Sequence, residues 1–453
     1  MFSAVVAVAA AAAFTVSFLL FQSIYSLFLS PLARVPGPKL FALTRWRLAY
    51  EDYKGIRSST VNELHKLYGP VVRVGPNEVS FNSLSALRTI YGAGSGFEKT
   101  LYYDFFDVYG RKNMFTFHSA KEHSERKKLV AQAFTKSAIL KGNNAAIVES
   151  KVREYLRLLD RENPVIETFS TLHYFAMDSV GEFLYGKFGK SACLEGIQSD
   201  RDILSDVLDP VRRKFTWFAM HLPKFTAWLY SRTGLAGSIA WIVQLPTAFT
   251  GARNHSLEAA LAFCNASTTA KAEDSSVIAK LWRHNQKANG LDDLDIASEC
   301  ADHFLAGLDT ASETTMFLIW ALSRPEQRKF QERLIDEVQG ISEEYLNGDG
   351  IPRAEVADKL RYLNAVIKET MRLYTPLGGP QPRLHPAATM IDGYMIPPKS
   401  VVFMSPYVMH RNPDVFKDPL KFNPERWLDE DTAQMDKWFW AFSSGGRMCI
   451  GLQ

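Results

Sequence analysis

A cysteine near the end of the chain stands in a segment that could make it a metal ligand. The segment FSSGGRMCIG covers residues 442–451 and contains Cys449. Glycines on both sides of the cysteine let the backbone fold tightly and bring its amides close to the sulfur, and Arg447 carries a charge that suits an anionic ligand. A thiolate held in this way can bind a metal. The alternative is a small buried cysteine that only fills the core.

A second segment, AGLDT at residues 306–310, lies in the middle of a long helical pattern. Glycine inside a helix costs about 1 kcal/mol relative to alanine, and Asp309 and Thr310 can compete for backbone hydrogen bonds. The segment therefore predicts a local opening of the helix. The alternative is a regular helix in which the Thr310 hydroxyl bonds a carbonyl one turn back and Asp309 faces solvent.

Charged residues at helical spacing, or between aromatic residues, occur in two further segments. Glu369 and Arg372 lie on one face of a helix that ends before Pro376. Arg426 stands between aromatic residues in FNPERW, residues 422–427. Most such charged pairs are exposed and contribute less than about 1 kcal/mol. An ordinary surface pair is therefore the alternative to a buried network.

These segments together resemble the cysteine loop, the AGxDT segment, the ExxR pair and the PERF-type segment of the cytochromes P450. The resemblance implies that Cys449 is the axial ligand of the iron of haem b, in a loop bounded by Phe442 and Gly451. Thiolate donation of this kind favours cleavage of the O–O bond.

The same resemblance assigns roles to the other segments. The groove beside Ala306 and Gly307 would accommodate dioxygen, Thr310 would hold the activated oxygen and its water, and Asp309 would relay protons inward. A buried charged network would lock the cysteine-loop side of the core, because removing one partner strands the others. The predicted network consists of Glu369, Arg372 and Arg426.

Haem propionates need cationic partners, and the family pattern assigns this role to Arg447 and to Arg383 in PQPRLHP. A helix that includes His123 and Lys127 would supply a further partner. It departs from the family's WxxxR, because His123 occupies the Trp position and Lys127 the Arg position. Both can donate to a carboxylate, although the bidentate geometry of Arg is lost. The alternative is that residues 126–128 form only a solvated basic face. On the proximal surface the same face could also dock an acidic flavoprotein reductase.

These residues need a frame that is mostly α with a minor β region. Helical periodicity covers residues 149–159, 207–230, 292–323 and 358–374. Alternating apolar and polar residues around Gly-Pro turns predict a hairpin at 68–81, and a second strand-like group lies at 395–405. The helix predicted at 292–323 would be on the order of 48 Å long, enough to cross a domain. The resemblance implies the cytochrome P450 fold.

Residues 1–30 contain no charged side chain. About 20 apolar residues suffice to cross a bilayer, so this stretch is predicted to be a transmembrane anchor; a cleavable signal peptide is the alternative. The nearby basic residues follow the apolar stretch, which by the positive-inside rule leaves residues 31–453 in the cytoplasm. We therefore expect a single-pass protein of the endoplasmic reticulum membrane, with Pro36-Gly37-Pro38 as a stiff elbow. The basic residues are Arg34, Lys39, Arg45 and Arg47.

The composition argues against several function classes. The formal net charge of +3, from 52 basic and 49 acidic residues, is too even for a nucleic-acid-binding domain. The four cysteines are widely spaced and form no CxxC pair, so neither a zinc site nor a disulfide framework is indicated. A reducing compartment fits this cysteine usage best. No internal repeat or low-complexity linker interrupts residues 31–453, so we expect one haem domain there.

The resemblance implies a monooxygenase that inserts one oxygen atom of O2 into a lipophilic small molecule, by hydroxylation or epoxidation. Electrons would come from NADPH through the flavoprotein NADPH-cytochrome P450 reductase, and the general style is similar to fungal microsomal members of secondary metabolism. Substrate contacts would come from residues 102–117, from 215–225 and from Leu305. Each of these is equally interpretable as ordinary core.

Only Leu452 and Gln453 follow Gly451, whereas family members continue with a helix that backs the haem and a final β segment. We therefore expect a P450 fold that lacks the C-terminal part of the final helix and the last β segment. A truncated, non-catalytic, membrane-anchored relative that does not retain haem is a second hypothesis. A haem-thiolate isomerase or dehydratase that uses no reductase is a third, which the Asp309-Thr310 pair disfavours.

Overall fold

The computed structural model describes residues 2–162, 164–208, 217–218, 220–230, 250–272, 274–285 and 290–452. The chain divides into two compact units. Unit 1 comprises Met1–Thr100 and Gly379–Asn412, and unit 2 comprises Leu101–Gly378 and Pro413–Gln453. Helices dominate, with small β-sheets, as the sequence predicts.

Unit 1 holds the named strands of the described residues. The predicted hairpin at 68–81 is present as β1 and β2, paired antiparallel with Val71 opposite Phe81. β2 also pairs in parallel with β7, which lies in the second strand-like group predicted at 395–405. The five-stranded sheet has the order β1-β2-β7-β4-β3, and β5 and β6 form a separate pair. The strands are β1 Val71–Gly75, β2 Glu78–Phe81, β3 Glu98–Lys99, β4 Arg383–Leu384, β5 Thr389–Ile391, β6 Tyr394–Ile396 and β7 Val401–Phe403.

A small core holds the helices of unit 1 against this sheet. Val72 and Val74 of β1, Phe403 of β7 and Val61 of α4 are buried together, as expected for β-branched and aromatic side chains on the covered face of a sheet. The helices are α1 Phe2–Ile24, α2 Lys39–Leu43, α3 Trp46–Tyr53, α4 Arg57–Tyr68, α5 Leu84–Tyr91 and α22 Pro406–Met409.

The predicted anchor forms one continuous apolar helical stretch. Residues Val5–Leu29 have a mean hydropathy of 2.1, and none of the most apolar window is buried in the protein. α1 passes into a short wider turn, η1 Tyr25–Leu29, where Ser26 is buried. The elbow follows. A Cβ on Gly37 would lie 2.4 Å from the carbonyl oxygen of Arg73, so only glycine fits this close approach.

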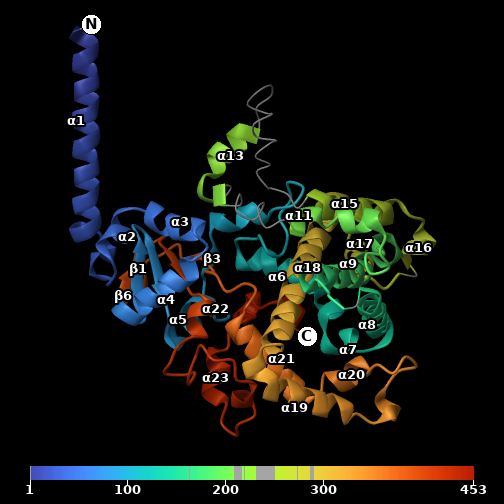
Figure 1. Cartoon of the computed structure of the whole chain (residues 1–453). Helices are drawn as coiled ribbons and strands as arrows, with labels where there is room; N and C mark the ends of the chain where they lie inside the picture. Colours follow the sequence, from blue (N-terminus) through green and yellow to red (C-terminus); the bar gives the residue numbers. More distant parts are fainter. Residues whose placement is uncertain are drawn as a thin grey trace. The chain divides into compact units, whose positions relative to one another are not determined.

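Unit 2 is built from helices around α18, Asp293–Leu322, which packs most extensively on α9 and α15 (Figure 1). Part of the helix predicted at 207–230 lies outside the described residues. The helices are α6 Ala120–Val130, α7 Lys136–Ile139, α8 Gly142–Glu162, α9 Thr168–Tyr185, α10 Gln198–Asp202, α11 Ser205–Leu208, α13 Pro223–Tyr230, α15 Thr250–Asn265, α16 Thr268–Ala272, α17 Val277–Trp282, α18, α19 Arg328–Gln339, α20 Ala354–Ala357, α21 Arg361–Leu373 and α23 Ala433–Trp438.

α18 begins and ends where its sequence signals predict. Asp292 and Asp295 form a reciprocal capping box at its first turn, which satisfies amides that have no helical partner. The helix ends at Ser323, ahead of Pro325. Its inner face, with Ala297, Phe304 and Leu308, is buried in the main hydrophobic cluster of unit 2. α18 is therefore the rigid element on which this unit is assembled.

Candidate active site at the cysteine loop

The cysteine loop is a tight turn that hydrogen bonds close. The Cys449 amide donates to the Phe442 carbonyl at 2.9 Å, and the Met448 amide donates to the Gly445 carbonyl at 3.1 Å. Ser443 and Gly445 both have positive φ, 60° and 65°, the region that glycine enters at least cost. The predicted glycine-dependent fold of this loop is therefore present. Cys449 as a whole residue is exposed, although neighbouring atoms cover much of its sulfur.

Opposing effects act on the thiol of Cys449. Burial of the sulfur by its neighbours is the largest, and it raises the thiol pKa. The Gly451 amide, which donates to the sulfur, and the positive charge of Lys127 both lower this pKa, while the negative charge of Asp302 raises it. On balance the pKa of Cys449 is raised, because burial outweighs the amide and the cation, which partly offset it in favour of the thiolate, the form that ligates metals.

Cationic side chains hold the cysteine loop from two directions. Arg447 donates to the carbonyl of Phe117 at 2.9 Å and to that of His118 at 2.5 Å. Lys127 of α6 donates to the carbonyls of Met448, at 2.8 Å, and of Gly446, at 3.3 Å. Arg447 and Lys127 thus both lie at the loop, and their role as propionate partners stays a prediction.

The basic segment of α6 is divided among different environments. Arg126 is buried and donates to Glu299 at 2.8 Å, Lys127 is half-buried against the cysteine loop, and Lys128 is exposed. His123 is buried one turn before Lys127. The interpretation of residues 126–128 as one solvated basic face is therefore wrong, because successive helical residues point in different directions.

The AGLDT segment is part of an uninterrupted helix, so the predicted opening is wrong. The Thr310 hydroxyl donates to the Ala306 carbonyl at 2.8 Å, as in the alternative of a regular helix. A Cβ on Gly307 would lie 3.2 Å from both methyl carbons of Val180, so glycine here permits α18 to pack closely on α9. Asp309 is half-buried, and its carboxylate lies 3.4 Å from Nε2 of His173.

The cysteine loop and the middle of α18 share one core. Ile450 packs against the cluster that contains Phe304 and Leu308, and Asp302 is close enough to raise the pKa of Cys449. Ala306 is exposed although it lies between buried positions of α18. The face of the helix that carries Ala306 and Thr310 is therefore accessible.

Glu369 is the centre of a fully buried charged network. Arg372 donates to both of its carboxylate oxygens, at 2.9 and 2.8 Å, and Arg426 donates to one at 3.2 Å. The Trp427 indole donates to Oε2 of Glu369 at 2.9 Å. The Asn423 amide donates to Oε1 at 2.9 Å, the oxygen that also accepts from Arg426. The structure thus brings together the predicted network residues and excludes the alternative of an exposed surface pair.

Comparison with known proteins agrees with this arrangement. The family model described as Cytochrome P450 matches residues 35–453. The chain belongs to the cytochrome P450 family. It is similar to cytochrome P450 monooxygenase stcB of Emericella nidulans, with 28% identity over 95% of this chain and 80% of the relative. It is also similar to aflV of Aspergillus parasiticus (30%, over 94% and 82%) and tndB of Aspergillus flavipes (28%, over 95% and 92%), which carry the same description.

The family implies haem iron, and the donors of this P450 fit that group. Cys449 offers a sulfur that accepts from the Gly451 amide and lies near the cation of Lys127. Lys127 contacts the loop and Arg447 belongs to it, so both are cations that would suit propionates. Small Ala306 leaves the facing surface of α18 open to a flat group.

Arg383, the remaining predicted propionate partner, lies in unit 1 of the P450. It occupies β4, where it is buried and its guanidinium lies 5.1 Å from the ring centre of Tyr91. Its Nη1 donates to the Pro382 carbonyl at 2.9 Å. The surroundings of Arg383 within unit 1 are thus an aromatic ring and a main-chain carbonyl.

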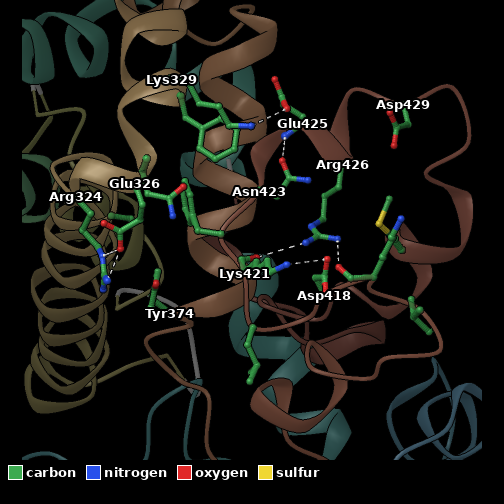
Figure 2. Close-up of a pocket in the computed structure, with 18 of the residues that line it drawn as sticks. Arg324, Glu326, Lys329, Tyr374, Asp418, Lys421, Asn423, Glu425, Arg426 and Asp429 are labelled. Carbon is green, nitrogen blue, oxygen red and sulfur yellow. Dashed lines mark hydrogen bonds and ion pairs between the residues drawn. The ribbon is translucent and has the colours of Figure 1, made fainter.

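A charged cleft of about 1000 Å³ lies beside the Glu369 network and away from the cysteine loop. Figure 2 shows residues of both signs around it, including Lys329, Glu425 and Arg426. Neither Cys449 nor Thr310 lines it. A cleft of mixed charge differs from the mostly apolar sites that hold lipophilic ligands, so it is not the active site of the P450.

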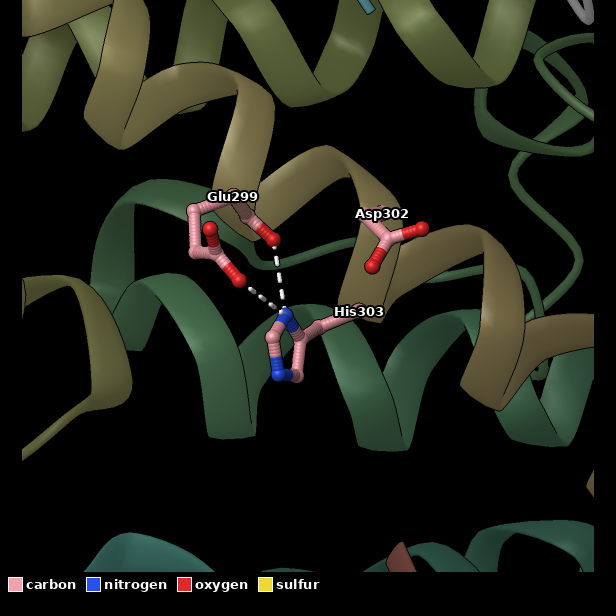
Figure 3. Close-up of side chains that lie close together, drawn as sticks. All are labelled: Glu299, Asp302 and His303. Carbon is pink, nitrogen blue, oxygen red and sulfur yellow. Dashed lines mark hydrogen bonds and ion pairs between the residues drawn. The ribbon is translucent and has the colours of Figure 1, made fainter. Parts of the chain in front are cut away.

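Glu299, Asp302 and His303 on α18 have potential metal-ligand atoms within 4.8 Å of one another. Figure 3 shows that the Nδ1 side of His303 faces Glu299; this nitrogen lies 2.8 Å from the Glu299 carbonyl oxygen. The Glu299 carboxylate is engaged by Arg126 and by the Met114 amide. These protein donors occupy the Glu299 carboxylate, which is one of the three groups that a metal would need. The sequence analysis did not identify Glu299.

Proposed function

We propose that this P450 is a haem-thiolate monooxygenase that inserts one oxygen atom of O2 into a lipophilic small molecule, in secondary metabolism. The carrying observation is Cys449. Its loop supplies the Gly451 amide and packs, through Ile450, against the hydrophobic cluster to which the helix of Asp309 and Thr310 also contributes. The fungal relatives described as cytochrome P450 monooxygenases support the reaction class.

Haem, when bound to Cys449, supplies the activation of dioxygen. The protein's own task is to deliver protons. The Thr310 hydroxyl, which donates to Ala306 here, can rotate to donate elsewhere or to accept. Asp309 is the next group inward, with His173 of α9 beside it. Because Nδ1 of His173 is 2.7 Å from the Phe169 carbonyl and donates to it, Nε2 is the nitrogen that can exchange a proton with Asp309.

We propose that electrons come from NADPH through a flavoprotein reductase. The helix α6, whose Lys127 contacts the cysteine loop, exposes Lys121 and Lys128. An acidic partner surface would be steered toward such cations. The substrate-contact residues proposed from the sequence include Leu305, which is half-buried against the main cluster; residues 215–216 and 219 lie outside the described residues.

Residues 1–30 are proposed to anchor the protein in the endoplasmic reticulum membrane, with residues 31–453 as a haem domain in the cytoplasm. Arg73, buried in β1, donates to the carbonyl and hydroxyl of Ser26 at 2.7 and 3.0 Å. The base of the anchor is thus fastened to the sheet. Trp46, Tyr50 and Tyr53 of α3 are exposed, and such amphipathic rings suit the membrane interface.

A carbon monoxide difference spectrum of the reduced full-length protein tests the function. Thiolate ligation is expected in the wild type and is expected to be lost in Cys449→Ser, with Cys264→Ser as the matched control. Cys264 lies on α15 and is not in the cysteine loop. A wild-type protein that binds no haem would overturn the proposal in favour of the non-catalytic relative. Oxygen uptake driven by NADPH and reductase separates a monooxygenase from an isomerase or dehydratase.

A further inference from the structure

Glu299 is a buried carboxylate that the proposed proton and electron steps do not use. It lies in the first third of α18 with no exposed surface. Its oxygens accept from the Met114 amide at 3.2 and 3.1 Å, and Arg126 of α6 donates to one of them at 2.8 Å. A buried charge requires this kind of compensation. Glu299 thus binds two segments that are distant in sequence from α18.

The first segment is a turn at residues 113–116 that its own hydrogen bonds close, and the two residues after it contact Arg447. The Asn113 amide donates to the Thr116 hydroxyl at 3.0 Å, and the Thr116 amide donates to the Asn113 side-chain oxygen at 3.1 Å. Glu299 holds this turn through Met114. The next residues, Phe117 and His118, supply the carbonyls that bind Arg447.

The second segment is α6. Arg126 faces inward to Glu299, with its guanidinium 5.2 Å from the ring centre of Phe117. Its neighbour Lys127 faces the cysteine loop and binds the carbonyls of Gly446 and Met448. The Glu299 carboxylate therefore contacts both segments that bind the loop. One is the turn whose following residues accept from Arg447, and the other is the helix that carries Lys127.

We propose that Glu299 is a positioning residue that sets the place of the Cys449 loop relative to α18 through the Met114 turn and Arg126. This deepens the proposed function and rests on it, because the loop presents the iron ligand. The role differs from general stabilisation. A positioning role predicts that substitution of Glu299 on α18 increases the mobility of the cysteine loop and leaves buried contacts elsewhere in the protein unchanged.

The test uses the full-length protein and Glu299→Gln, which keeps the volume and loses the charge. Glu149→Gln is the matched control, since Glu149 of α8 also accepts from a backbone amide, that of Ala354 at 3.1 Å, but does not contact the loop. Hydrogen exchange is measured for the loop peptide, residues 439–452, in protein without haem. Loss of a hydrogen bond between charged groups shifts an equilibrium on the order of tenfold, so exchange of this peptide should rise by about that factor.

Carbon monoxide spectra provide the second readout. Glu299→Gln should lower the thiolate-ligated fraction per bound haem, and Glu299→Asp, which keeps the charge, should recover most of it. Arg126→Gln should act in the same direction, and the double variant should lose less than the sum of the two single losses, because both substitutions break the Arg126–Glu299 pair while only Glu299→Gln also alters the acceptor of the Met114 amide. If Glu299→Gln fails to fold, Glu299→Asp and Arg126→Gln decide the question in the same assays.

Loop exchange in Glu299→Gln no faster than in Glu149→Gln would overturn the proposal. So would an additive double variant, since additivity means that Arg126 and Glu299 act separately. A wild-type protein without a thiolate spectrum would overturn the proposed function instead. The exchange experiment on the protein without haem would still decide whether Glu299 positions the loop.

Discussion

The Glu369 network permits a quantitative prediction for Glu369→Gln. The substitution keeps the size of the side chain and removes its charge. Arg372 and Arg426 then lose their counter-charge inside the protein, because the side chain of Arg372 has no exposed surface and that of Arg426 is 7% exposed. Breaking a buried ion pair from one side costs about 3–5 kcal/mol. The glutamine NH2 also replaces an acceptor. In either orientation it faces a nitrogen of Arg372, together with the Asn423 amide in one case and the Trp427 indole in the other.

The expected loss corresponds to a fall in the melting temperature of about 5–7 °C for a unit of this size. Differential scanning calorimetry of the full-length protein measures it. Glu337→Gln is the matched control. Glu337 accepts from the amides of Tyr362 and Leu363, at 2.7 and 2.8 Å, at the start of the same helix, α21. Since Glu337 accepts from neutral amides and its substitution strands no buried cation, its loss should be smaller, about 1.5–3 kcal/mol.

The reasoning is refuted if Glu369→Gln loses no more stability than Glu337→Gln. A double-mutant cycle with Arg372→Met sharpens the test. If the cost comes from the stranded guanidinium, the double variant should be more stable than the sum of the single losses predicts. Strict additivity would show that the two side chains contribute independently.

Other side chains yield further predictions. Lys127→Met should raise the pKa of Cys449, since the ammonium lowers it; the pH dependence of alkylation at Cys449, read by mass spectrometry, should shift upward, and no shift would contradict the assigned effect. Burial lowers the pKa of His65 to about 4 from 6.5, so its neutral form stabilises the fold at neutral pH, and about 3 kcal/mol should be lost as the pH falls from about 6.5 to 4. Urea unfolding of His65→Gln should lack this component, and an unchanged pH dependence would exclude it. Arg73→Met should leave the Ser26 carbonyl without its buried donor and speed proteolysis near residues 30–38; cleavage at the wild-type rate would show that Arg73 does not fasten the anchor.

Local patterns predicted the features that depend on neighbours in the sequence. The caps of α18 and the hairpin of β1 and β2 follow from side-chain and turn chemistry within a few residues. The cysteine loop also follows from its own glycines, as the positive φ of Gly445 shows. Such features have a signal that can be read without the rest of the fold.

The errors came from contacts between distant segments. Gly307 was interpreted as a helix opening, whereas it allows close packing on Val180 of α9. The alternative that residues 126–128 form one solvated face fails because the partner of Arg126 is Glu299 of α18. An acidic residue on a helix looks exposed until a buried cation is found for it, and no local pattern indicates that partner.

The opposite attachments of Arg126 and Lys127 have a mechanical consequence for α6. Adjacent residues of a helix point about 100° apart, so rotating α6 about its axis to shorten one contact lengthens the other. The two contacts together therefore resist rotation of α6 about its own axis. Substitutions that change side-chain length at either position should therefore be tolerated only when the other position compensates.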